Sequence, residues 1–118
     1  MTVPPIDLLI SDIDGTLVTP DKLLTSASIA AVTALAAAGI AFSVVSSRPP
    51  RGMTEIVEAL GVRLPFAAFN GGSLMESGRG LIGAFRLKAA ASDQILRLLA
   101  RREIDAWVFA DDTWRLRD

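Results

Sequence analysis

The chain has 118 residues, 51% of them hydrophobic, and its 12 basic and 13 acidic residues give a net charge of -1. This length suits a domain of ordinary size, and the balanced charge gives no support to a nucleic-acid or acidic-surface partner. The sequence contains no cysteine and no histidine, which excludes disulfides, structural zinc sites and histidine-based triads.

The first part of the chain predicts strands that alternate with helices. The expected elements are a strand over Ile6–Ser11, a helix from Thr25 or Ser26 to about Ala38, a strand over Ile40–Ser46, a helix over Met53–Leu60 and a strand over Phe66–Phe69. The first strand is a continuous apolar run, which is typical of a strand covered on both faces. Gly39 and Gly61 follow the two helices as stop signals. This order predicts an α/β fold with a Rossmann-like parallel sheet.

The pattern changes after Asn70. The sequence predicts two strands joined by a turn at Ser77–Gly80, a helix over Ala89–Arg102 and two strands around a turn at Asp111–Thr113. Antiparallel strands do not continue a parallel pattern, so we expect two parts. Residues 1–71 would form the N-terminal part of a core, and residues 72–118 a second unit.

One stretch, Leu23–Ser47, has no charged residue and is long enough to cross a membrane. Its pattern changes from helical to strand-like at Gly39, and the stretch is rich in Ala, Ser and Thr. We therefore expect a helix–strand pair, no membrane partner and, since the N-terminus has no basic signal region, a cytoplasmic protein.

Polar residues follow the three parallel strands, where each strand ends. Asp12 follows the first strand, Ser46 ends the second and Asn70 follows the third. Ligands of parallel sheets bind outside the carboxyl ends of the strands. The sequence therefore predicts a binding site at this edge of the sheet.

Asp12 and Asp14 supply the chemistry of this site. A bare carboxylate is repelled by an anionic phosphate, but Mg²⁺ held by oxygen ligands removes the repulsion. Asp12 could then be a nucleophile that forms an aspartyl-phosphate, and Asp14 a general acid and base. The alternative is that both acids are only turn and cap residues.

Other groups near the acids could hold the phosphate. Gly15 lets the backbone approach a ligand and its neighbouring amides form an anion nest. Ser46, the exposed amides after it at Ser47, and Arg48 could bind phosphate oxygens.

The sequence resembles the haloacid dehalogenase-like hydrolase superfamily. "DIDGTL" looks like its first signature, "SVVSSRP" is similar to its second, and "FNGGSLM" resembles the point where Cof-type phosphatases leave the core for an α/β cap. "WVFADDTWRLRD" resembles a strand pair within that cap. The resemblance implies a partial Rossmann-like core followed by part of an α+β cap.

The resemblance also implies a role for each matching residue. Asp12 would be the nucleophile and a Mg²⁺ ligand, and Asp14 the acid/base, with its carbonyl on the metal. Ser46 would bind the transferring phosphate, and Thr16 would orient Asp14. Arg48 and Asn70 would lie near the substrate, a small phosphorylated metabolite. Ser47 stands where many Cof-type relatives have Gly.

The third and fourth signatures of the superfamily, a lysine and an acidic cluster, follow the cap, and this chain is expected to end inside the cap. We therefore expect an N-terminal fragment that is inactive alone and that self-associates through an exposed sheet edge.

Two alternatives stay open. One is a non-catalytic phosphate-responsive or interaction module, although a receiver domain needs a carboxylate where Asn70 stands. The other is a short phosphatase completed by oligomerisation, with Lys88 or the pair Asp111 and Asp112 supplied by a neighbour. Trp107 and Trp114 are expected to pack in the cap rather than stack on a substrate.

Overall fold

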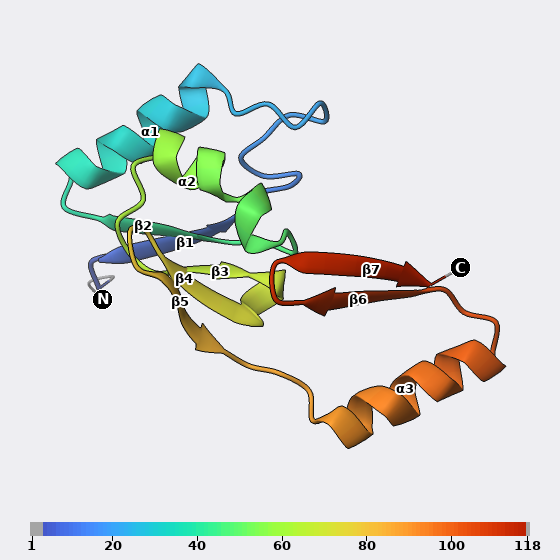
Figure 1. The fold of residues 1–118 in the computed structure, drawn as a ribbon. Helices are drawn as coiled ribbons and strands as arrows, with labels where there is room; N and C mark the ends of the chain where they lie inside the picture. The colour runs from blue at the N-terminus through green and yellow to red at the C-terminus, as the bar shows by residue number, and fades with distance from the viewer. Residues whose placement is uncertain (1–3, 118) are drawn as a thin grey trace. The chain divides into compact units, whose positions relative to one another are not determined.

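A computed structural model describes residues 4–117. The chain forms two compact units, one up to Ala84 and one from Phe85 onward. The first unit contains β1 (Leu8–Asp12), α1 (Ser26–Ala37), β2 (Ala41–Val45), η1 (Pro50–Gly52), α2 (Thr54–Ala59), β3 (Phe66–Ala68), η2 (Phe69–Gly71), β4 (Ser73–Glu76) and β5 (Gly80–Ala84) (Figure 1). The second contains α3 (Ala89–Arg101), β6 (Ala106–Ala110) and β7 (Thr113–Arg117). The predicted order of helices and strands is confirmed.

The first unit is built on a mixed sheet with the strand order β1-β2-β3-β4-β5. The pairs β1–β2 and β2–β3 are parallel, whereas β3–β4 and β4–β5 are antiparallel. The predicted α/β, Rossmann-like core is thus confirmed. The last two strands continue the sheet instead of starting the second compact unit, because β4 pairs with β3 from Phe66↔Met75 to Ala68↔Ser73. The expected boundary after residue 71, which separates core from cap, stays a prediction.

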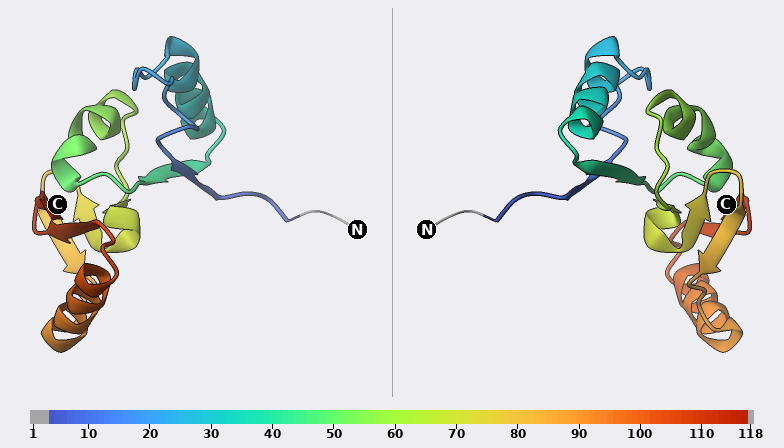
Figure 2. Two further views of the ribbon diagram at one scale, coloured as in Figure 1. Left: turned by 90° about the vertical axis from the view of Figure 1, so that its right-hand side faces the viewer. Right: turned by 90° about the vertical axis from the view of Figure 1, so that its left-hand side faces the viewer.

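Helices α1 and α2 lie on the same side of this sheet (Figure 2). The Thr25 side chain caps α1 by accepting a hydrogen bond from the N–H of Ser28. Gly39 follows the helix with φ +77°, a conformation that favours glycine. The helices and the sheet enclose one core, whose largest buried apolar side chains include Ile13, Val44, Met53 and Val57.

β1 differs from the expected strand. It was predicted to be covered on both faces, and this is wrong: Leu8 is 47% and Ile10 59% exposed. Within the described residues β1 has a neighbour on one side only, β2, and so forms an edge of the sheet. An apolar run thus indicates that both faces of a strand can be buried. It does not show that the elements that would cover both faces are present.

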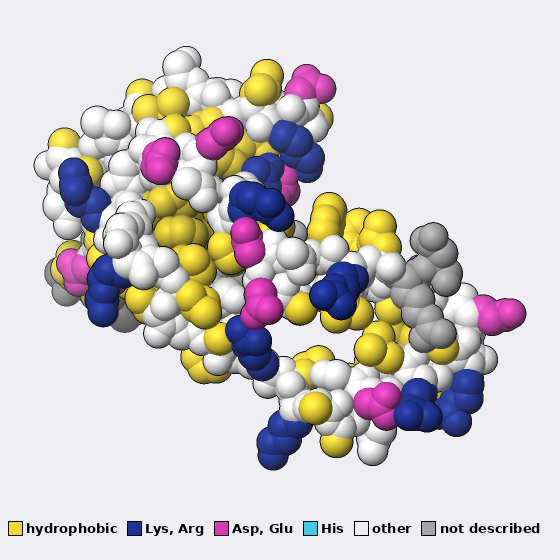
Figure 3. Space-filling model, viewed as in Figure 1, with side chains coloured by type: hydrophobic (Ala, Val, Ile, Leu, Met, Phe, Trp, Pro, Cys, Tyr) yellow, Lys and Arg dark blue, Asp and Glu magenta, His cyan; other side chains and the backbone are white. Residues whose placement is uncertain are grey.

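The second unit consists of α3 and the β6–β7 hairpin. Asp111, with φ 54°, starts the predicted hairpin turn. Trp107 and Trp114 pack edge to face with centroids 5.0 Å apart. Both remain more than half exposed, so their expected role in packing stays a prediction. Apolar side chains remain exposed here (Figure 3). The helical spacing of Ile95 and Leu98 in the sequence predicts that both point inward, yet both remain exposed. Among residues 4–117, no helix is both long and apolar enough to cross a membrane.

Candidate active site

At the end of β1, the carboxylates of Asp12 and Asp14 flank a buried side chain. Ile13 is fully buried, whereas Asp12 is exposed and Asp14 partly buried. The chain then turns sharply, because the N–H groups of Thr16, Leu17 and Val18 all donate to the Ile13 carbonyl, at 3.3, 2.9 and 3.3 Å. This turn fixes both acids at the carboxyl end of the strand.

Gly15 and Thr16 lie exposed in this turn. Gly15 has φ +78°, a backbone conformation that side chains disfavour, and a Cβ there would meet nothing within 4 Å. The open space above Gly15 is compatible with the close approach of a ligand to the backbone.

The end of β2 lies beside the acids. Asp12 is in register with Val45, the last residue of β2, so Ser46 follows the residue that lies directly opposite Asp12. Ser46 is 1% exposed, and its Oγ accepts a hydrogen bond of 3.2 Å from the N–H of Arg48. This contact uses the hydroxyl as an acceptor and leaves its proton to donate to a ligand oxygen. Ser47, between the two, is exposed.

The end of β3 is tied to the same loop by its backbone. The N–H of Asn70 donates to the Ser46 carbonyl at 2.8 Å, and the N–H of Phe69 donates to the Arg48 carbonyl at 3.0 Å. These bonds hold three successive residues, Phe69, Asn70 and Gly71, at φ 51°, 54° and 97°. Left-handed backbone at non-glycine residues is strained, so this turn is held by the structure around it. The structure therefore brings Asn70 to the loop that carries Ser46 and Arg48.

Arg48 joins the ends of β1 and β2 through its side chain. Its Nε donates to Asp14 Oδ2 at 2.8 Å and its Nη2 donates to Asp14 Oδ1 at 2.9 Å. This hydrogen-bonded pair is the main cause that holds the pKa of the Asp14 carboxyl well below its usual range; partial burial acts in the opposite direction. Asp14 is therefore ionised in this arrangement.

Lys22 contacts Asp14, although the sequence analysis gave it no place near the acids. Its Nζ donates to Asp14 Oδ1 at 2.9 Å, and it further lowers the pKa of Asp14. Thr16, by contrast, donates its backbone N–H to the Ile13 carbonyl. In the described part of the chain, Arg48 and Lys22 are the side chains that donate to Asp14. The role expected for Thr16 stays a prediction.

The sequence just before Lys22 contains a signal for the turn that brings this residue near Asp14. The N–H of Thr19 donates to the Leu23 carbonyl and the N–H of Lys22 donates to the Thr19 carbonyl, both at 2.9 Å, so Pro20, Asp21 and Lys22 form a three-residue hairpin loop. Proline followed by aspartate marks this kind of turn.

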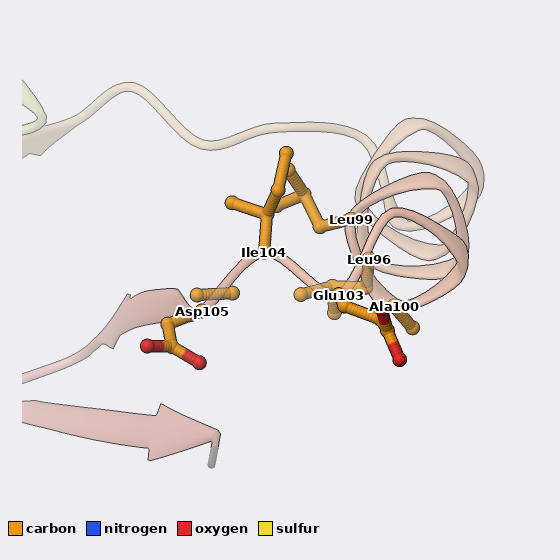
Figure 4. Close-up of a pocket in the computed structure, with 7 residues that line it drawn as sticks. Leu96, Leu99, Ala100, Glu103, Ile104 and Asp105 are labelled. Carbon is orange, nitrogen blue, oxygen red and sulfur yellow. The ribbon is translucent and has the colours of Figure 1, made fainter.

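The second unit contains Lys88, Asp111 and Asp112, the residues that a neighbouring chain was expected to supply if oligomerisation completes the site. Asp111 accepts a hydrogen bond of 2.9 Å from Arg86 Nη2 in that unit, so an ion pair and a turn account for it. A pocket of about 290 Å³ between the end of α3 and the start of β6 is lined partly by Glu103 and Asp105 (Figure 4). Carboxylates there would repel a phosphate ester, so this pocket does not compete with the edge at Asp12.

Comparison with known proteins agrees with this geometry. A family model described as haloacid dehalogenase-like hydrolase matches residues 9–118. The chain belongs to this family. No curated protein sequence matches the chain significantly.

Several solved structures of haloacid dehalogenase-like proteins share the fold. A phosphatase from Bacteroides thetaiotaomicron has a TM-score of 0.81 at 20% identity, over 99% of this chain and 45% of that one. A sugar phosphatase of subclass IIB has a TM-score of 0.75 at 18% identity, over 93% and 43%. A hydrolase from B. subtilis has a TM-score of 0.74 at 23% identity, over 88% and 36%. The chain thus spans less than half the length of these structures.

Haloacid dehalogenase-like proteins are generally metal-dependent, and the donor set at the end of β1 suits a hard cation in part. Asp12 offers an exposed carboxylate whose Oδ1 accepts one N–H, from Ile13 at 2.8 Å. Both side-chain oxygens of Asp14 are engaged by Arg48, which leaves its carbonyl for a metal. Within residues 4–117 no group of three acidic side chains forms a metal cluster. The residues present therefore fit Mg²⁺ as two ligands of a larger set.

Proposed function

We propose that this chain carries the nucleophile part of the site of a Mg²⁺-dependent phosphatase that hydrolyses a small phosphorylated metabolite. The observation that supports this proposal is the meeting of Asp14, Ser46 and Arg48 beside Asp12 at one edge of a parallel sheet. In α/β proteins this edge is the usual ligand site.

In the proposed reaction an Asp12 oxygen attacks the phosphorus of the ester and the bond to the alcohol oxygen breaks. Asp14 gives its proton to that oxygen, so the alcohol leaves and an aspartyl-phosphate remains. Asp14, now a carboxylate, takes a proton from water, which attacks the phosphorus and releases phosphate and Asp12. The Ser46 hydroxyl donates to a phosphate oxygen. Mg²⁺, held by the Asp12 carboxylate and the Asp14 carbonyl, would neutralise charge on the phosphate.

The acid step requires a change at Asp14. A carboxylate bound by Arg48 and Lys22 has no proton to give, so these cations must move from its oxygens before Asp14 can act as an acid. A phosphate ester competes for the same cations, because its oxygens accept the same hydrogen bonds. Substrate binding and protonation of Asp14 would thus be coupled.

The isolated chain is expected to show little or no turnover. Two oxygen ligands hold Mg²⁺ weakly, and the nearby cations already neutralise Asp14. The measurement is hydrolysis of a generic aryl phosphate with and without Mg²⁺, after circular dichroism has shown that the chain is folded.

Asp12→Asn is the matched variant for this assay, because it keeps the shape and removes the nucleophilic charge. Mg²⁺-dependent turnover that Asp12→Asn abolishes would contradict the expected inactivity and would favour a site completed by oligomerisation. Turnover that survives Asp12→Asn would count against the proposed mechanism itself.

We also propose, from the exposed Leu8 and Ile10 of β1, that the chain self-associates through this strand. Light scattering over a range of protein concentrations tests the proposal. A monodisperse monomer at the highest concentration would contradict it.

A further inference from the structure

Lys22 stands at a turn position that does not suit lysine. It is the last residue of the loop Pro20–Lys22 and has φ 65°. Three-residue hairpin loops commonly end with a left-handed residue there, and glycine is the residue that adopts this conformation without strain. The backbone alone would therefore favour glycine at position 22.

The ion pair with Asp14 does not account for lysine at this position either. The Lys22 side chain is 64% exposed, and exposed ion pairs contribute little to stability because water and salt screen them. The strain of a left-handed non-glycine residue is at least as large as that contribution. Folding stability thus gives no reason for an ammonium group here.

The charge of Asp14 is also satisfied without Lys22. Arg48 alone donates to both oxygens of the carboxylate. Lys22 adds a second positive charge on Oδ1, and a lysine ammonium has three N–H donors, of which this contact uses one. Asp14, Arg48 and Lys22 together therefore carry an excess positive charge with unused donors.

The excess positive charge of Asp14, Arg48 and Lys22 lies at the edge of the sheet where a phosphate ester would bind. Ser46 Oγ contacts the Arg48 backbone, the Arg48 side chain contacts Asp14, and Asp14 contacts Lys22, so the four residues form one hydrogen-bonded chain. We propose that Lys22 is a substrate-binding residue, whose ammonium transfers from Asp14 to the anionic ester when substrate enters. The inference rests on the proposed phosphatase function and adds to it a cation from the loop after β1.

Binding of inorganic phosphate to the 118-residue chain tests the inference, with nuclear magnetic resonance as the measurement. Lys22→Met is expected to weaken phosphate binding by about three- to tenfold, the loss of one charge-assisted contact. Lys22→Arg, which keeps the charge, is expected to stay within about twofold of the parent chain.

Arg79→Met is the matched control. Arg79 forms an exposed ion pair of the same kind, with Glu76 at 2.7 Å, and its side chain is 73% exposed. The control removes one positive charge from the same unit, away from Asp14, and is expected to leave phosphate binding unchanged. An equal loss in Arg79→Met and Lys22→Met would show a general charge effect and would overturn the inference.

Ser46→Ala separates failure of the inference from failure of the proposed function. Phosphate binding that Ser46→Ala weakens and Lys22→Met leaves unchanged would overturn the role of Lys22 alone. Absence of phosphate binding in the parent chain, or binding that neither Ser46→Ala nor Lys22→Met weakens, would overturn both.

Discussion

Replacement of Ile13 by alanine is expected to lower the free energy of unfolding by about 2–5 kcal/mol, the usual cost of truncating a fully buried isoleucine. Ile13 is 0% exposed and stands between the two acids of the candidate site. Its carbonyl also accepts the three N–H groups that form the turn after β1. Chemical denaturation followed by circular dichroism measures the change.

Ile10→Ala is the matched control for this prediction, since it makes the same substitution three residues earlier. Ile10 lies in β1 and is 59% exposed in the single chain, so its truncation is expected to change stability by less than about 0.5 kcal/mol at protein concentrations where the chain is monomeric. Similar losses in both variants would show that β1 is covered in solution, for example by a second copy of the chain.

Replacement of Arg48 by methionine is expected to lower the free energy of unfolding at neutral pH by about 1.5–3 kcal/mol, the range for hydrogen bonds to a charged group. The side chains of Arg48 and Asp14 are only 21% and 28% exposed, so solvent screens this pair less than a surface pair. Urea denaturation at a series of pH values is the measurement.

The pH dependence of this loss has a definite sign. The pKa of Asp14 in the folded chain lies below its ordinary value of 3.8, mainly because Arg48 donates to it. The stabilisation is therefore complete above the unfolded-state pKa and is lost as the pH falls toward the folded-state pKa. The difference between parent and Arg48→Met is expected to be full at pH 7 and to shrink below about pH 4. A difference that is independent of pH would contradict the role of this ion pair.

Much of the first unit could be predicted from the sequence because its signals are local. Glycine stops and apolar runs mark α1, β2 and α2, and polar residues at successive strand ends mark the site. Asp12 and Ser46 could be placed side by side because parallel strands bring their carboxyl ends to one edge.

What could not be predicted depends on partners distant in the sequence. The pairing of β4 with β3 depends on the free edge of β3. The exposure of Ile10 follows from the position of α1 and α2 on one side of the sheet, because the described residues of the first unit place no helix on the other face. Lys22 contacts Asp14 because a loop folds back on itself, and a lysine in a loop usually lies in solvent. A sequence pattern indicates which structure a segment can form, whereas these three features depend on which other residues the segment contacts.

The position of β1 at the edge of the sheet has a consequence for hydrogen exchange. Only β2 pairs with it in the described chain, so backbone amides that point away from β2 have no ladder partner to protect them. We expect these amides to exchange with solvent far faster than those of β2, which has a strand on each side. Asp12, the proposed nucleophile, thus ends a strand that is expected to be less protected from exchange than the neighbouring strand β2.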